Sequence, residues 1–229
     1  MSQNKVRVLV VDDEQAIRIF LRVALESQQY AVFEAVSGQD ALSGATSHRP
    51  DIIILDLGLP DIDGVEVVRL LRQWTQVPII ILSIRGSDVD KIAALDAGAD
   101  DYLIKPFSMG ELIARLRVAL RRVAQPRNEP VFTSGVLEVD LVRRIVTVAS
   151  REVKLTRNEY ELLRVFILHA GKMLTHVQLL HEVWGPGYAN ESHMLHVNIS
   201  NLRGKIEPEP SHPRLIVTEP GVGYRLRAD

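Results

Sequence analysis

The sequence predicts an α/β fold, a doubly wound five-stranded parallel sheet, followed by a smaller α+β domain. In residues 1–123, apolar runs alternate five times with stretches whose apolar residues have helical spacing. A proline-containing segment, 124–130, is predicted as a linker to residues 131–229, where the pattern changes. Alternating strands and helices are typical of parallel sheets, so the first half alone accounts for the doubly wound part.

Each apolar run of the first half lacks the polar alternation of a half-exposed strand, as expected when helices cover both faces of a sheet. The predicted strands are residues 6–11, 31–35, 52–57, 77–83 and 101–106. The stretches that follow them place apolar residues three and four apart. They are predicted as helices over residues 15–26, 38–48, 65–74, 88–98 and 110–122.

The second half begins with three predicted antiparallel strands, over residues 131–140, 143–150 and 151–155. Two helices then start at capping-box patterns, T-x-x-E at 156–159 and T-x-x-Q at 175–178. A third covers about 191–207 and ends before prolines, and 214–227 is predicted as a hairpin with a Pro-Gly turn. Two helices and a hairpin in this order predict a winged helix-turn-helix.

Composition excludes several classes of protein. The 229 residues are 46% hydrophobic and 24% charged, which is typical of a globular chain, and they contain no cysteine for disulfides or thiolate chemistry. No apolar stretch reaches the roughly 20 residues of a membrane span, and the N-terminus has no signal-peptide pattern. We therefore expect a cytoplasmic protein without a membrane partner. Residues 1–125 hold 14 basic and 17 acidic residues and the remainder 13 and 12, which permits nucleic-acid binding by the second half.

Three acids stand at the carboxyl ends of predicted strands, where ligands of open parallel sheets bind. Asp12 and Asp13 end the first strand and Asp56 the third, while Ser83 and Lys105 end the fourth and fifth. Clustered carboxylates repel one another and favour a hard cation such as Mg²⁺. A metal, a hydroxyl and an ammonium together suit a phosphoryl group. An aspartate at one strand end is often only a helix cap, so the prediction depends on all five positions together.

These motifs resemble those of the receiver domain of two-component response regulators: VDDE at 11–14, DLGLPDIDG at 56–64, Ser83, and YLIKPF at 102–107. The resemblance extends over the chain, because residues 131–229 are similar to the winged-helix effector of the OmpR/PhoB class. It implies a flavodoxin-like receiver in which Asp56 accepts a phosphoryl group from a sensor histidine kinase. It also implies that Asp12, Asp13, Asp56 and the Gly58 carbonyl hold Mg²⁺.

The resemblance further implies that Ser83 and Lys105 bind phosphoryl oxygens and that Tyr102 is a switch residue. The Lys105–Pro106 bond is expected to be cis, and turnover to be limited to slow autodephosphorylation, so the chain is not expected to be an enzyme. The stretches 13–26, 71–74 and 91–107 more narrowly resemble regulators of high-affinity potassium uptake.

Two positions depart from the family pattern. Residue 84, usually alanine, is Ile84, and Gly58 is smaller than common residues two positions after the phosphoacceptor. We expect a changed lifetime of the phosphoryl group, which unchanged dephosphorylation in Ile84→Ala would contradict. Ile84 could also hinder small phosphodonors.

Charged residues also gather in the predicted fourth helix, fifth strand and fifth helix. A solvated surface is the default explanation for them, since exposed pairs contribute only about 0–1 kcal/mol. The resemblance implies a symmetric receiver dimer in the phosphorylated state, with salt-sensitive pairs used twice. The implied cross-subunit pairs are Lys91–Glu111, Asp100–Arg122 and Asp101–Arg115.

The helix at 191–207 has an apolar stripe expected to face the core, and an ordinary amphipathic surface helix would show the same pattern. The resemblance assigns double-stranded promoter DNA to its other side. It implies base contacts by Met194, Asn198 and Asn201, and contacts nearer the phosphates by Arg203 and Lys205. It implies a contact of Thr218 with the DNA backbone or the minor groove. Because asparagine pairs with adenine, we predict A·T-containing direct repeats bound by a dimer.

Other features leave alternatives open. The loop 185–192 either contacts RNA polymerase, as in the family, or only connects two helices. His181, His193 and His196 could hold a metal, but histidines flanking a DNA-binding surface are the expected explanation.

Two other functions compete with a phosphorylation-switched regulator. A haloacid-dehalogenase-type phosphatase needs an acid two residues after the nucleophile, where this chain has Gly58. A regulator that binds DNA without phosphorylation and uses its receiver only to dimerise is disfavoured by the intact acid, hydroxyl and lysine set.

Overall fold

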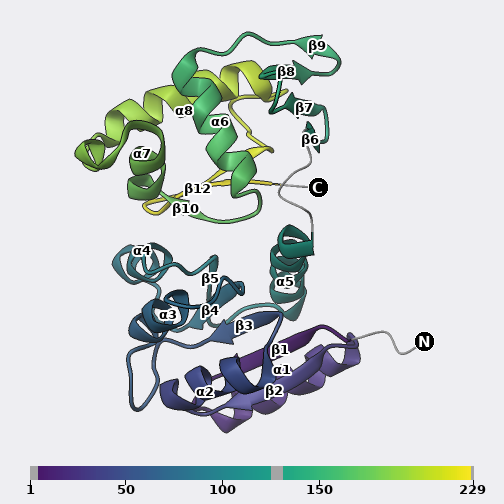
Figure 1. Cartoon of the computed structure of the whole chain (residues 1–229), viewed down its shortest axis with the longest axis vertical. Helices are drawn as coiled ribbons and strands as arrows, with labels where there is room; N and C mark the ends of the chain where they lie inside the picture. Colours follow the sequence, from purple (N-terminus) through teal and green to yellow (C-terminus); the bar gives the residue numbers. More distant parts are fainter. Residues whose placement is uncertain (1–4, 125–130, 228–229) are drawn as a thin grey trace. The chain divides into compact units, whose positions relative to one another are not determined.

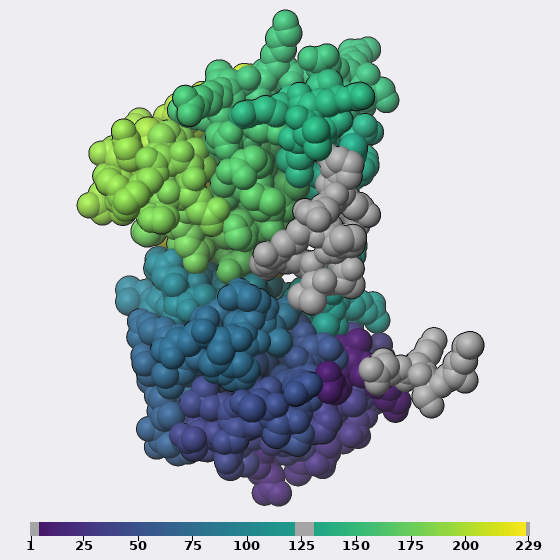
Figure 2. Space-filling model, in the orientation of Figure 1, coloured from purple at the N-terminus to yellow at the C-terminus, as the bar shows by residue number. Residues whose placement is uncertain are grey.

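The computed structural model describes residues 5–124 and 131–227, without the side chains of residues 122–124. Contacts divide the chain into two units, Met1–Val123 and Ala124–Asp229, each of which is described by itself. The predicted linker at 124–130 falls almost entirely on residues 125–130, outside the described residues. On the face seen in Figure 2, the purple-to-blue atoms of the first unit and the green-to-yellow atoms of the second each form a continuous packed surface.

The first unit is built on a five-stranded sheet in the order β2-β1-β3-β4-β5, and every neighbouring pair is parallel (Figure 1). The strands are β1 (Arg7–Val11), β2 (Ala31–Ala35), β3 (Ile52–Leu55), β4 (Ile79–Ser83) and β5 (Asp101–Ile104). This order changes direction between β1 and β3, and ligands of such sheets bind beyond the carboxyl ends at that point.

Five helices cover both faces of this sheet, which explains why its strands β3 and β4 are buried and almost entirely apolar. They are α1 (Gln15–Ser27), α2 (Gly38–His48), α3 (Gly64–Arg72), α4 (Asp88–Asp96) and α5 (Met109–Ala124). Leu21 and Leu25 of α1 and Leu112 and Leu116 of α5 pack with one set of alternating strand residues. The opposite set, which includes Leu9, lies beneath α2, where Gly44 closely approaches that leucine.

The second unit holds two antiparallel sheets. The first has the order β6-β7-β8-β9, with β6 (Val131–Ser134), β7 (Leu137–Asp140), β8 (Ile145–Val148) and β9 (Arg151–Glu152). The second has the order β10-β12-β11, with β10 (Leu174–Thr175), β11 (Ile216–Glu219) and β12 (Gly223–Leu226).

Three helices of this unit pack on one another: α6 (Arg157–Leu168), α7 (His176–Trp184) and α8 (Ser192–Ile206). A short 3-10 helix, η1 (Pro186–Tyr188), lies in the loop between α7 and α8. Both predicted capping boxes are confirmed, because the side chains of Thr156 and Thr175 accept from the backbone three residues on. In the reverse direction, the Thr156 N–H donates to the Glu159 side chain and the Thr175 N–H donates to the Gln178 side chain. These paired bonds fix where α6 and α7 begin.

The predicted fold class is confirmed, with three local differences. The strand predicted at 131–140 is two strands, β6 and β7, which pair with each other across a turn at Gly135, where φ is +55. The strand predicted at 151–155 is shorter, because only Arg151 and Glu152 pair with β8. The two-residue β10 was missed, and it turns the predicted hairpin into a three-stranded sheet. A Cβ on Gly223 would lie 1.9 Å from the Leu174 carbonyl oxygen, so this pairing requires glycine there.

The turn of the hairpin is as predicted. Gly221, after Pro220, has φ +74, and the Val222 N–H donates to the Glu219 carbonyl at 3.1 Å. Among the described residues, no helix combines the length and hydropathy needed to cross a bilayer.

Candidate functional site

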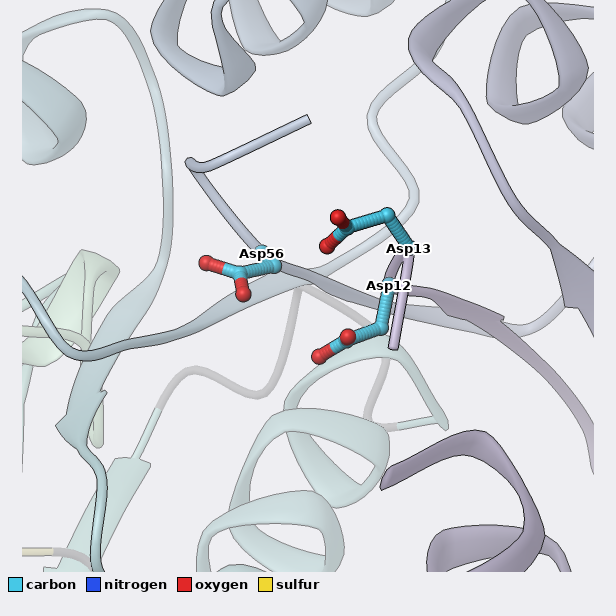
Figure 3. Close-up of side chains that lie close together, drawn as sticks. All are labelled: Asp12, Asp13 and Asp56. Carbon is cyan, nitrogen blue, oxygen red and sulfur yellow. The ribbon is translucent and has the colours of Figure 1, made fainter. Parts of the chain in front are cut away.

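The three predicted acids come together at the carboxyl edge of the parallel sheet. Asp12 and Asp13 directly follow β1 and Asp56 directly follows β3, its neighbour in the sheet. One carboxylate oxygen of each lies within 4.8 Å of the others, and Figure 3 shows the side chains converging. Asp12 and Asp56 are buried while Asp13 is exposed, so the cluster is open to solvent on one side.

Lys105 neutralises part of this negative charge. Its ammonium lies 2.7 Å from Oδ2 of Asp12 and 2.7 Å from Oδ2 of Asp56. Burial lowers the pKa of Lys105, but the bonds and charges of the two aspartates outweigh burial and raise it. Burial raises the pKa of Asp12 more than the bonds from Lys105 and the Glu14 N–H lower it. The ammonium therefore stays charged and bridges the ends of β1 and β3.

The loop after Asp56 is held close to the Asp56 carboxylate by short local contacts. The Gly58 N–H donates to Oδ1 of Asp56 at 3.2 Å. A Cβ on Gly64, the last residue of the DLGLPDIDG motif, would lie 2.6 Å from the Asp56 carbonyl oxygen and 2.5 Å from Cα of Leu57. This close approach requires glycine at position 64, and it lets α3 begin directly beside the reactive carboxylate.

A second set of predicted residues lines the neighbouring loop. Ser83 at the end of β4 is fully buried, and its Oγ accepts from the Arg85 N–H at 3.3 Å. The Tyr102 hydroxyl donates to the Arg85 carbonyl. The Arg85 side chain reaches Asp63, at the start of α3, with 2.9 Å between Nη1 and Oδ2. Arg85 thus links the loops that follow Ser83 and Asp56, a contact that the sequence did not suggest.

The two departures from the family pattern have different surroundings. The Ile84 side chain is 75% exposed, so its bulk extends largely into solvent. A Cβ on Gly58 would meet only Oδ1 of Asp56, at 4.0 Å, so this position has room for a larger side chain. Gly58 therefore leaves open space beside the Asp56 carboxylate.

The donor set fits a divalent cation. Three carboxylates within 4.8 Å of one another offer the oxygen ligands that Mg²⁺ prefers, and one of them faces solvent. Together with a backbone carbonyl and water, such a set can complete six-fold coordination. The Lys105–Pro106 bond that follows β5 is cis, as expected from the family.

Charged residues of the predicted dimer surface have partners inside their own chain. Arg115 donates to Oδ1 and Oδ2 of Asp101 at 3.0 and 2.8 Å and to Oε1 of Glu111 at 2.7 Å. Lys91 lies 3.8 Å from Asp88. Any cross-subunit pair of Asp101 with Arg115 would therefore exchange an existing intrachain partner.

Asp100 is buried and is held by Arg72, 2.8 Å away, and by the Ile79 N–H at 3.0 Å. This position differs from the solvent-facing one expected for a cross-subunit pair with Arg122. The side chain of Arg122 lies outside the described residues.

Helix α8 buries the predicted stripe of Leu195, Ile199, Leu202 and Ile206. The exposed residues on its other side are His193, His196, Val197, Ser200, Asn201 and Gly204. Two of the residues predicted to contact bases are less exposed than these. Met194 packs against the core and Asn198 is half-buried, with its amide donating to the Met194 carbonyl at 2.9 Å. Of the predicted base-contacting residues, only Asn201 lies on the exposed side.

The cations assigned to phosphates have intrachain partners. Arg203 donates to the Ile216 carbonyl at 2.6 Å and to the Thr218 hydroxyl at 2.7 Å. Lys205 lies 2.6 Å from Oε2 of Glu159 in α6. Arg203 therefore ties α8 to the hairpin of β11 and β12, and Lys205 ties α8 to α6.

Three residues with structural partners were missed. Arg18 donates to the carbonyls that precede α1, Arg85 bridges two loops, and Glu207 accepts from three consecutive N–H groups, those of residues 214–216. Arg18 lies within the apolar pattern of α1, so no sequence signal distinguishes it from a surface cation. His193 and His196 are exposed, and the His196 ring lies 5.2 Å from that of His176.

Comparisons with known proteins agree with this geometry. Residues 8–117 match the response regulator receiver domain family, and residues 150–226 match the C-terminal domain of transcriptional regulatory proteins. The KDP operon transcriptional regulatory protein KdpE of Escherichia coli (strain K12) is 54% identical over 220 residues, 96% of this chain and 98% of that relative. The KdpE of Mycobacterium tuberculosis (strain CDC 1551 / Oshkosh) is 47% identical over 223 residues, 96% and 99% of the two chains.

A solved structure covers both units. The crystal structure of DrrB, described as a Thermotoga maritima OmpR/PhoB homolog, matches with a TM-score of 0.52 and 29% identity over 98% of this chain and 100% of that one. Together with the two family matches, it accounts for the receiver sheet and for the winged helix. The chain therefore belongs to the response regulators of the OmpR/PhoB class, which combine a receiver domain with a DNA-binding domain.

Proposed function

We propose that this response regulator is switched by phosphorylation of Asp56 by a sensor histidine kinase, and that the phosphorylated form binds promoter DNA as a dimer. The observation that carries this proposal is the crevice at the ends of β1 and β3. Three carboxylates and the Lys105 ammonium converge there, with the Ser83 hydroxyl at the end of the next strand. Such a set matches the charge and oxygen geometry of a phosphoryl group.

In the proposed step, a carboxylate oxygen of Asp56 attacks the phosphorus of a phosphohistidine. The new O–P bond forms as the P–N bond breaks, and the electron pair returns to the histidine nitrogen. Bound Mg²⁺, held by Asp12, Asp13, Asp56 and the Gly58 carbonyl, would supply positive charge for the phosphoryl oxygens. Lys105, now shared between two aspartates, would pair with a phosphoryl oxygen. Ser83 would donate its hydroxyl to another.

The contacts of Arg85 would transmit the change at the phosphorylated site to the rest of the receiver. Recruitment of Ser83 alters the contact between its Oγ and the Arg85 N–H, and the same residue is bonded to Tyr102 and Asp63. Tyr102 would thus follow the loop, and the dimer-competent state would become favoured. The cycle consumes one phosphoryl group per switch with slow autodephosphorylation, which is not the turnover of an enzyme.

We place the dimer on α4, β5 and α5. A twofold axis would let Arg115 exchange its intrachain bonds to Asp101 for the same bonds across the interface, and Lys91 would meet Glu111. Asp100 and Arg122 would form the third pair, for which Asp100 would have to leave Arg72. Such charge pairs across an interface would weaken with salt.

For the effector we propose direct-repeat half-sites containing A·T pairs, read from the exposed side of α8. Its relatives named KdpE suggest that the target is a potassium-uptake operon. The loop that contains η1 is proposed to contact RNA polymerase. A cytoplasmic location follows from DNA binding and a kinase donor.

The test is a DNA-binding titration of wild type and Asp56→Asn, each with and without the phosphorylated kinase. The promoter fragment carries candidate direct repeats. We expect the kinase to tighten binding by wild type alone. Equal binding by all four samples would favour instead a regulator that binds DNA independently of phosphorylation.

A further inference from the structure

A buried arginine lies beneath the two acids that follow β1. The Arg18 side chain, one turn into α1, is only 11% exposed. Its Nη1 donates to the carbonyl oxygen of Asp12 at 2.7 Å and to that of Asp13 at 2.9 Å. One guanidinium nitrogen therefore holds the backbone of both residues whose carboxylates face the crevice.

Glu34 fixes the direction of this guanidinium. It stands on β2, and its Oε2 accepts from Nε of Arg18 at 3.2 Å. Its other oxygen accepts from Arg22, one turn further along α1, at 2.7 Å. Arg22 is 42% exposed, and within residues 5–124 no hydrogen bond joins it to the acidic loop. The two arginines thus share a carboxylate, but Arg18 alone of the pair touches the backbone of residues 12 and 13.

Few other contacts set the shape of this loop. The Asp12 N–H donates to the Ala35 carbonyl at 3.2 Å, and Oδ1 of Asp12 accepts from the Glu14 N–H at 2.9 Å. Within residues 5–124, no hydrogen bond or ion pair is found for the Asp13 carboxylate, which is exposed. The direction of that carboxylate depends on the backbone that Arg18 holds.

We propose that Arg18 is a positioning residue for the metal site, with Glu34 orienting its guanidinium. By binding the carbonyls of Asp12 and Asp13, it turns both carboxylates toward Asp56 before a cation arrives. This inference rests on the proposed Mg²⁺ site and adds the residues that preorganise it. Groups that orient ligands commonly change metal affinity about 10- to 100-fold when they are removed.

The test is calorimetric titration of Mg²⁺ into the full chain. Arg18→Met should weaken binding about 10-fold or more, since the two carbonyls lose their donor. The Mg²⁺ affinity of Arg18→Lys should lie between those of wild type and Arg18→Met. A lysine ammonium lacks the fork geometry with which the guanidinium binds both the carbonyls and Glu34. Glu34→Gln should weaken binding several-fold. Arg22→Met is the matched control and should bind Mg²⁺ like wild type. It removes the other arginine bound to Glu34 but leaves the bonds from Arg18 to the loop carbonyls in place.

A second readout separates positioning from a purely structural role. The rise in melting temperature caused by saturating Mg²⁺ reports affinity, because binding to the folded state stabilises it by mass action. A merely structural Arg18 would lower the melting temperature equally with and without Mg²⁺. If Arg18→Met does not fold, Arg18→Lys and Glu34→Gln decide the question by the same comparison. Unchanged affinity in the folded variants would overturn the proposal.

Asp13→Asn distinguishes this outcome from failure of the proposed function. Wild type should bind Mg²⁺ and Asp13→Asn should not. If wild type itself shows no binding, or if Asp13→Asn binds equally well, the metal site is wrong and the role of Arg18 is overturned with it. If Asp13→Asn loses binding while the Arg18 variants keep it, only the positioning role is wrong.

Discussion

The receiver crevice and the DNA-facing helix use their charged residues in opposite ways. At the crevice, groups from β1, β3 and β5 are brought to one point, and Lys105 contacts two carboxylates from different strands. On α8, the cations expected to face DNA contact the protein itself, Arg203 at β11 and Lys205 at α6. A site at strand ends is fixed by topology, whereas a site on a helix depends on rotation about its axis.

The largest expected change in the free energy of unfolding is that of Lys105→Met, which tests whether Lys105 is the counter-ion of the crevice. Lys105→Met leaves two buried carboxylates without their cation, and breaking such a pair costs about 3–5 kcal/mol. The loss in free energy of unfolding should be smaller with millimolar Mg²⁺, which replaces the missing charge. Urea unfolding with and without Mg²⁺ measures it, with the exposed Lys5→Met as control. An equal loss in both conditions would contradict a shared role for Lys105 and the metal.

The second effect concerns the effector, where a carboxylate has a purely structural use. Buried Glu207 accepts from the N–H groups of Arg214, Leu215 and Ile216. Glu207→Ala leaves these donors unpaired and should lower the stability of the effector by about 2–3 kcal/mol. Urea unfolding followed by Trp184 fluorescence in a Trp74→Phe background measures it. Exposed Glu209→Gln should change little, and comparable losses in both variants would count against this role of Glu207.

A third measurement sharpens the assignment of the DNA-facing side. Asn201 is exposed on α8, whereas the amide of Asn198 is bonded to the Met194 carbonyl. Asn201→Ala should weaken binding to an A·T-containing promoter fragment by about 1–3 kcal/mol, the value of a bidentate contact with adenine. Asn198→Ala should have a smaller effect in the same fluorescence-anisotropy titration. The reverse order would restore the side chosen from the sequence.

The smallest effect is a pH dependence of the effector. Burial, and then the charge of His196, lowers the pKa of His176. Just below the ordinary histidine pKa of about 6.5, His176 therefore binds more protons in the unfolded protein than in the folded protein. The free energy of unfolding should fall as the pH drops through that range. The loss stops once the folded histidine is itself protonated. Between pH 7.5 and 5.5 the melting temperature should fall less for His176→Gln than for wild type. Exposed His181→Gln should match wild type.

The sequence predicts the crevice well because strand ends leave little freedom. Asp12, Asp13, Asp56 and Lys105 follow apolar runs, so the order of parallel strands alone brings them together. The capping boxes are similarly local, and the start of α6 and α7 follows from four residues each. These features depend on position along the chain, which the sequence states directly.

The DNA-facing side of α8 was assigned from the family resemblance, which does not state how far each side chain is exposed. The direction opposite its buried stripe passes through Val197 and Gly204, which carry no polar side chain, and Met194 and Asn198 lie nearer the core. Arg203 and Lys205, which the resemblance assigns to phosphates, have partners on β11 and α6 that lie 13 and 46 residues away in the sequence. Contacts of that kind cannot be inferred from spacing within one helix.

The carboxylate of Glu207 has a consequence for mutational screens. It lies immediately after α8 and holds the start of β11, so the reading helix and the strand that follows it are joined within a few residues. A substitution there would shift the hairpin relative to α8 and would be scored as a loss of operator recognition. Its side chain is 6% exposed and would touch no nucleotide. Variants that fail to recognise their operator can therefore arise from a residue hidden inside the protein.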